Sequence, residues 1–137
     1  MLCVTYASVS FDAMKTAMCS ESSLKHSNLR EGETYLSVTW LEHFDPRYDQ
    51  GLIQAADAIR RQLIVKPTDG FSTTAVGDFY DICERFDEKV RVLHEPENPE
   101  NTGHVAIRRF PRDNLDLFDM LASDAFVDTR VAADVVP

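Results

Sequence analysis

The sequence is short of cysteine and of long apolar runs, and each shortage excludes a class of protein. Cys3, Cys19 and Cys83 are an odd number of cysteines without metal-binding spacing, so we expect neither a disulfide framework nor a zinc site. No basic leader precedes an apolar core, and no segment approaches the roughly 18 apolar residues that a membrane span needs. We therefore expect a cytoplasmic protein that neither crosses nor binds a membrane.

Basic side chains are also scarce. The chain has 14 Lys and Arg residues against 23 Asp and Glu residues, which gives a formal net charge of −9. Nucleic-acid binding is not expected, because polyphosphate affinity depends on clustered cations. Two basic groups occur, Arg60-Arg61 and Arg108-Arg109-Arg112. Either group could hold one phosphate or carboxylate of a ligand, although such groups more often balance nearby acids on a solvated face.

Familiar catalytic motifs are absent from the sequence. It contains no GxxxxGK[ST], GxGxxG, HExxH, GxSxG or CxxC. Phosphate-loop nucleotide binding, dinucleotide binding, zincin chemistry, hydrolase-elbow chemistry and thioredoxin-like redox chemistry are therefore unsupported.

What is present suits one small globular domain. The chain has 137 residues, of which 44% are hydrophobic and 27% are charged, and eight Phe, four Tyr and Trp40 supply bulk for a core. We expect a single domain over residues 1–137. Whether residues 1–33 pack on the core is left open, and residues 127–137 form either an edge strand or a frayed tail.

Hydrophobic periodicity predicts alternating strands and helices. Residues 34–44, "TYLSVTWLEHF", alternate as a strand with one buried face. Asp45 and Pro46 suit the N-cap and first turn of a helix whose apolar face ends at Leu63. Further segments are a short strand ("FSTTAV"), a helix with Cys83 on its buried face, strands in "KVRVLHE" and "HVAIRRF", and a helix capped by Asp113. The opening "LCVTYASVSF" suits a strand, followed by a short helix in "DAMKTAMC".

This order predicts an α+β fold: a small mixed or antiparallel sheet with about three helices packed on it. The connection between "KVRVLHE" and "HVAIRRF" is too short for a parallel crossover, so these strands should form an antiparallel hairpin.

The hairpin carries the main candidate catalytic residues. If His94 opposes His104, their Cβ atoms lie about 5 Å apart on one face, whereas a register shift of one residue separates them. With Glu95 nearby, one imidazole could act as a general acid or base, and Ser37 could join the site only if its strand lies beside the hairpin. Two imidazoles and a carboxylate would also suit zinc or iron, but the spacing matches no specific metal motif. We expect no metal and no cofactor.

Other residues are candidates for binding rather than catalysis. Trp40, Glu42 and His43 follow one another closely at the end of the first secure strand, and Arg108 lies in the second hairpin strand. A histidine such as His43 more often caps a strand end than lines a cleft.

Three blocks, in order, resemble a family of small bacterial proteins of unknown function. They are "YLSVTWLEHF", "LIVKPTDGFSTTAVGD" and "VRVLHEPENPENTGHVAI", which together cover roughly residues 34–107. The polar run from Ser72 to Ala75 departs from that family's pattern, where apolar residues stand. The resemblance implies a bacterial, intracellular, stand-alone domain of the kind encoded in mobile-element or defence-related operons. It implies no catalytic residues.

We therefore expect a non-catalytic interaction or ligand-binding module whose partner is a protein or a small ligand. An acidic surface could complement a basic partner. The alternative is a small hydrolase or transferase that uses His94 and His104, with or without a metal.

Overall fold

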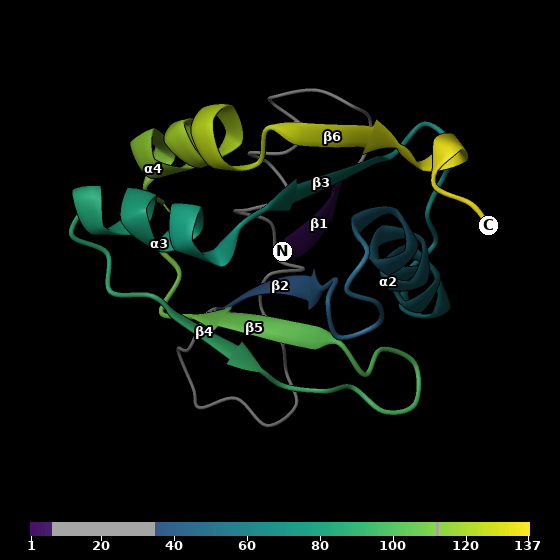
Figure 1. The fold of residues 1–137 in the computed structure, drawn as a ribbon. Helices are drawn as coiled ribbons and strands as arrows, with labels where there is room; N and C mark the ends of the chain where they lie inside the picture. Colours follow the sequence, from purple (N-terminus) through teal and green to yellow (C-terminus); the bar gives the residue numbers. More distant parts are fainter. Residues whose placement is uncertain (7–34, 112) are drawn as a thin grey trace.

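The computed structural model describes residues 1–6, 35–111 and 113–137, which form six strands and several helices (Figure 1). The elements are, in chain order, β1 (Leu2–Tyr6), β2 (Tyr35–Trp40), α2 (Tyr48–Gln62), β3 (Gly70–Thr74), α3 (Val76–Arg85), β4 (Arg91–His94), β5 (His104–Arg108), α4 (Leu115–Met120), the π-helical turn η2 (Leu121–Ala125), β6 (Asp128–Val131) and the 3₁₀ turn η3 (Ala132–Asp134).

The six strands form one antiparallel sheet in the order β4-β5-β2-β1-β3-β6. This confirms the predicted α+β fold with helices packed on a small sheet, and β4 and β5 pair as the predicted hairpin. The last strand, β6, lies at the edge of the sheet beside β3. No helix of the described segments is long and apolar enough to cross a membrane.

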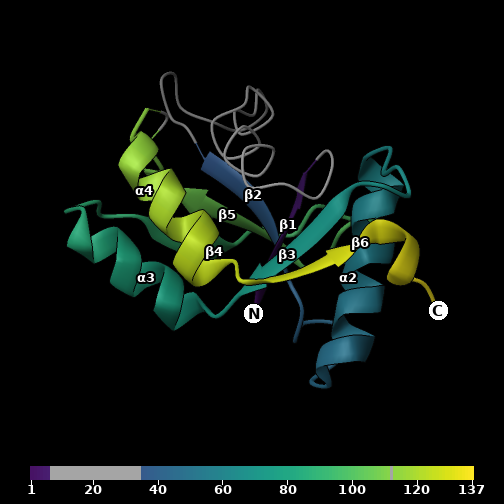
Figure 2. The ribbon, with the colours of Figure 1, turned by 90° about the horizontal axis from the view of Figure 1, so that it is seen from above.

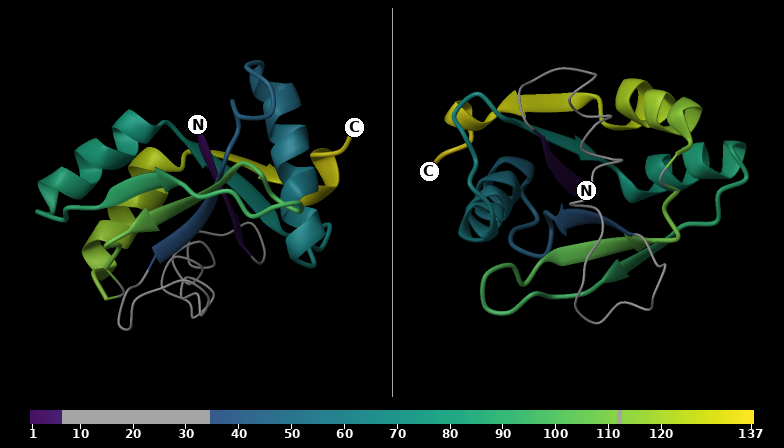
Figure 3. Two further views of the ribbon diagram at one scale, coloured as in Figure 1. Left: turned by 90° about the horizontal axis from the view of Figure 1, so that it is seen from below. Right: turned by 180° about the vertical axis from the view of Figure 1, so that it is seen from behind.

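Helices cover both faces of the sheet. Figures 2 and 3 show α3 and α4 on one side and α2 on the other. Neighbouring side chains of a strand point to opposite faces, and Leu2 and Cys3 accordingly enter two separate cores. Leu2 packs with residues of α3, α4 and η2, whereas Cys3 packs with residues of α2.

This two-sided cover corrects one expectation for β2. Leu36 and Val38 alternate with Ser37 and Thr39 as predicted, but Thr39 is also buried, because α2 covers the side expected to face solvent. Trp40 falls on the same side of this alternation as Leu36 and Val38, which is the side expected to be buried, but it is 37% exposed. The strand is central in the sheet, so both faces are buried along most of its length.

Two helix starts, and the burial of the residue at one helix end, differ from the prediction. α2 begins at Tyr48 with Arg47 as its N-cap, and Asp45 instead accepts a hydrogen bond from the Arg47 backbone N–H at 2.8 Å. α4 is capped by Asn114, not Asp113, through a 3.1 Å bond from the Leu117 N–H. Leu63 ends α2 and is exposed.

Cys83 lies on the buried face of α3, as predicted. Burial raises the pKa of its thiol to about 12, so the thiolate that a nucleophile needs is disfavoured. The predicted helix in "DAMKTAMC", Cys19 and Arg112 lie outside the described residues.

Candidate functional site

The register of the β4–β5 hairpin separates the two histidines. His94 pairs with Val105, while His104 pairs with Thr39 on the other neighbour of β5. Paired residues share a face and adjacent residues do not, so His94 and His104 point to opposite faces of the sheet. The joint site that would need both imidazoles on one face is not formed. Each histidine instead belongs to a cluster of its own.

The first group, the buried histidine cluster, is centred on His104 beneath the end of α2. The cluster consists of Tyr35, Ser37, Glu95, Glu97, His104 and Arg108. His104 is only 3% exposed. Its Nδ1 lies 2.8 Å from the backbone oxygen of Glu95, which can only accept, so Nδ1 carries a hydrogen.

The other ring nitrogen of His104 has two oxygen neighbours. Ser37 Oγ lies 2.7 Å from Nε2, and Glu97 Oε1 lies 3.3 Å from it. In a neutral ring the Ser37 hydroxyl donates to Nε2, whereas in the cation Nε2–H donates to either oxygen. The structure thus brings together Ser37, His104 and the backbone of Glu95 from the predicted catalytic set.

The carboxylate of Glu95 is bound to Arg108. Arg108 Nε and Nη2 donate to its two oxygens at 2.7 and 2.5 Å, and the guanidinium carbon lies 5.2 Å from the centroid of the Tyr35 ring. This is a fork-to-fork pair, the strongest geometry for these two groups. Arg108, a predicted binding residue, therefore balances a neighbouring acid.

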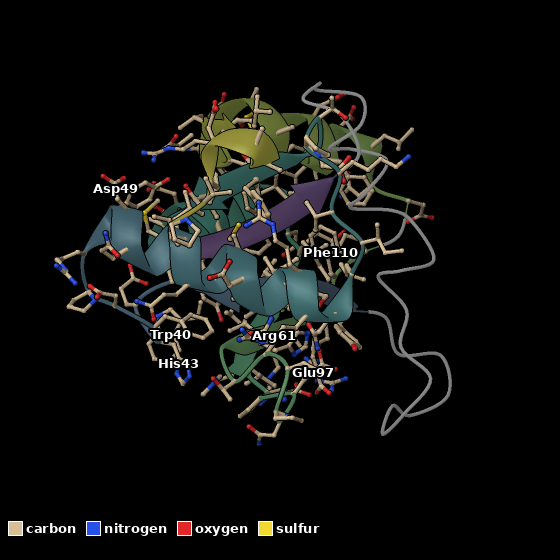
Figure 4. The ribbon with its side chains drawn as sticks, turned by 90° about the vertical axis from the view of Figure 1, so that its right-hand side faces the viewer. Trp40, His43, Asp49, Arg61, Glu97 and Phe110 are labelled. Carbon is tan, nitrogen blue, oxygen red and sulfur yellow. The ribbon has the colours of Figure 1, made fainter. Side chains whose placement is uncertain are left out.

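The loop between β4 and β5 is fastened to α2 and β2. Arg61 donates to the Glu100 backbone oxygen at 2.7 Å, and Gln62 donates to Glu97 at 3.1 Å. Asn101 is 1% exposed and donates to Thr39 Oγ1 at 2.9 Å. Figure 4 shows Arg61 of α2 facing the loop that carries Glu97. The loop is therefore bound to the domain along its length.

Sequence reasoning missed Asn101, Arg61 and Gln62. Asn101 Oδ1 accepts from the Gly103 N–H at 3.1 Å, a local turn bond for which the spacing Asn-x-Gly was the available signal. No sequence signal pairs the end of α2 with this loop, because their contact depends on tertiary packing.

The second group, the surface aromatic cluster, gathers Trp40, His43 and His94 with Phe44 and Thr102. The centroid of the His94 ring lies 5.4 Å from that of Trp40 and 5.1 Å from that of His43. The ring centroids of Trp40 and His43 are 5.8 Å apart. All three rings are exposed at the end of β2, and Figure 4 shows Trp40 and His43 next to each other. Two predicted binding residues and one predicted catalytic residue therefore form one surface.

Both imidazoles of this surface form hydrogen bonds with Thr102. His94 Nε2 lies 2.8 Å from the Thr102 backbone oxygen, and His43 Nε2 lies 3.0 Å from its hydroxyl. Gly103 permits this approach, because a Cβ there would lie 2.6 Å from Phe44 Cε2. Glu42, another predicted binding residue, lies outside this cluster. Its carboxylate pairs with the amino group of Met1 at 2.5 Å.

Comparison with family models, curated proteins and solved structures found no match for the chain. The resemblance to the bacterial family, and the cytoplasmic location, therefore stay predictions. Within residues 1–6, 35–111 and 113–137, no three His, Cys, Asp or Glu side chains are grouped so that they could hold a metal ion.

Proposed function

We propose that the protein is a non-catalytic interaction module that binds another protein through an acidic face centred on the helices α3 and α4. The charge of these helices and the exposure of Trp40 on the face of the sheet that they cover support this function. The partner is a protein with a basic surface.

The helices α3 and α4, with η2, carry exposed acids. They and their flanking residues include Asp78, Asp81, Glu84, Asp87, Asp113, Asp116, Asp119 and Asp124, all exposed. In the described part of these segments the basic side chains are Arg85 and Lys89. Because α3 packs against α4 and η2, the elements that carry these acids lie together on one side of the sheet (Figure 2). Such a field accelerates association with a basic surface.

The observation that carries the proposal is the exposure of Trp40 on the same face of the sheet. Leu2 pairs with Trp40 on one side and with Thr74 on the other, so the three side chains point to one face. Helix α3, which begins at Val76, covers that face. An exposed indole on the face of the sheet that a charged helical layer covers is typical of an interface hot spot with a polar rim. The exposed Leu115 on α4 adds a second apolar contact.

The test compares variants of the immobilised protein as bait for proteins of its native cell. We expect the wild-type bait to retain a protein, and we expect Trp40→Ala and the double charge reversal Asp81→Lys/Glu84→Lys to retain it no longer. Matched controls lie elsewhere: Ile64→Ala removes a side chain that is 95% exposed. Glu100→Lys/Asp134→Lys makes the same change in net charge at exposed positions. Both controls should retain the protein.

Salt provides a second readout of the same experiment. Binding steered by opposite charges weakens as ionic strength rises, because screening shortens the range of the field. The proposal is wrong if the wild type retains nothing beyond what the charge-reversed variant retains, or if the two control variants lose the same protein.

A second candidate function rests on the pair Ser37 and His104. A nucleophile bonded to a base, with the base oriented by a third group, is the arrangement of covalent acyl transfer. The 2.7 Å contact and the Glu95 carbonyl on Nδ1 fit that arrangement. However, the Glu97 carboxylate beside the same nitrogen would repel a developing oxyanion. His104 is also buried.

A fluorophosphonate probe separates the two functions. An activated Ser37 would be labelled, with the label absent in Ser37→Ala. We expect no label on Ser37, detected by mass spectrometry of the digested protein, and labelling at that residue would favour the hydrolase.

A further inference from the structure

The two imidazoles of the surface aromatic cluster are arranged as a pair of ligands. We propose that His43 and His94 together bind a borderline divalent transition-metal ion such as zinc. The inference goes beyond the protein-binding proposal and does not depend on it. An ion shared by His94 and His104, which the residue types would suit but which we did not expect, has no site because those rings lie on opposite faces.

The ring separation supports a shared ion. An ion about 2.0–2.1 Å from one nitrogen of each ring, with a tetrahedral angle between the bonds, places the ring centroids about 5 Å apart. The centroids of His43 and His94 are 5.1 Å apart, with ring planes at 53°.

The hydrogen bonds to Thr102 leave a nitrogen of each ring for the ion. His94 Nε2 faces the Thr102 carbonyl oxygen and must donate to it, so the lone pair of the neutral ring is on Nδ1. The Thr102 hydroxyl lies 3.0 Å from Nε2 of His43, and in the tautomer whose Nε2–H donates to this hydroxyl the lone pair is again on Nδ1. Among the described residues, no hydrogen bond reaches Nδ1 of either ring.

Thr102 therefore acts as the hydrogen-bond partners of metal-bound histidines do. Histidine ligands usually give their second ring nitrogen to a carbonyl, carboxylate or water, which fixes the ring and raises its basicity. Here one residue orients both rings, and Asn101, buried beside it, fixes the backbone of that residue. Because the described residues offer no third ligand, solvent or an added molecule would fill the other positions.

The sole tryptophan, Trp40, reports on this site, because its ring lies within 5.8 Å of both imidazoles. Titration of the full chain with Co²⁺ should quench its fluorescence saturably, and Zn²⁺, which has no unpaired electrons, should displace Co²⁺ and restore the signal. We expect His43→Ala and His94→Ala each to weaken Co²⁺ binding at least tenfold. Thr102→Val, which keeps the carbonyl, should weaken it less.

Glu42→Gln is the matched control, since Glu42 is next to His43 in sequence but pairs with Met1. Its Co²⁺ affinity should equal that of the wild type. A second measurement needs no variant: Zn²⁺ should protect His43 and His94, but not the other histidines, from diethyl pyrocarbonate. Unsaturable quenching, equal losses of affinity in Glu42→Gln and the histidine variants, or unprotected imidazoles would each overturn the two-histidine site.

Discussion

Two histidines at the ends of one hairpin loop have opposite surroundings. His104 is buried and bonded to a backbone oxygen and two side-chain oxygens, while His94 is exposed among aromatic rings. A buried imidazole with its hydrogen bonds satisfied stabilises a fold, whereas an exposed one beside an indole is available to ligands. One residue type in one loop thus has two different environments, and the strand register decides which.

The largest expected effect comes from removing the buried ring. His104→Ala should lower the free energy of unfolding by about 2–4 kcal/mol, because it leaves a cavity and deprives Ser37 and the Glu95 carbonyl of a partner. His94→Ala should cost only about 0.5 kcal/mol. Urea unfolding of both variants measures the difference, and equal losses would contradict the division between a structural and an available histidine.

The second-largest loss of stability is expected on replacing Asn101. Asn101→Ala removes the bonds to Thr39 and Gly103 from a buried side chain, which should cost about 1–3 kcal/mol in the same urea experiment. Glu100→Ala is the control, because Glu100 is exposed and Arg61 binds only its backbone oxygen. If both variants unfold alike, the loop is not fastened by Asn101.

Gly103 links the loop to the surface aromatic cluster. In Gly103→Ala the new methyl group meets Phe44 at 2.6 Å and His43 at 3.2 Å, so these rings must shift at a cost of about 1 kcal/mol. The emission of Trp40 should change, because its neighbour His43 moves. Gly77→Ala, at a helical position with nothing within 4 Å, should be neutral or stabilising and leave the emission unchanged. An unaltered emission in Gly103→Ala would place the cluster elsewhere.

The smallest effect concerns Asp45, in the segment that carries His43 to α2. Hydrogen bonds from Arg47 lower the pKa of Asp45 to about 2 from its usual 3.8. Because the folded pKa is the lower one, its contribution to stability is present above about pH 4 and is lost as the pH falls through about 2. Asp45→Asn should therefore show a slightly smaller drop in Tm over that interval. If the Tm of Asp45→Asn falls as much as that of the wild type, the pair of Asp45 and Arg47 is not formed.

Local patterns predicted the fold better than the site. Period-two alternation in β2 and the three-and-four spacing of Phe79, Ile82 and Cys83 in α3 are local signals, and the structure has both elements. The register of β4 on β5 is not local, since it depends on the length and bonding of the loop between them. One residue of register exchanges the two faces, so the partners of His94 and His104 could not be read from their spacing.

The burial of β2 on both faces also could not be predicted from the sequence. Ser37 and Thr39 have the composition of a solvated face, yet α2 and the loop around Asn101 bury Thr39 and supply its hydrogen-bond partner. Polar residues of this kind indicate burial only once their partners are known.

We propose that the buried histidine cluster stabilises the domain and that the face on which Trp40 is exposed binds the partner. Paired measurements on Trp40→Ala and Ser37→Ala test it most directly, with partner retention and urea unfolding recorded for both. We predict that Trp40→Ala loses the retained protein at nearly unchanged stability, while Ser37→Ala keeps it and loses stability. Loss of the partner in Ser37→Ala at wild-type stability, with retention in Trp40→Ala, would contradict the claim.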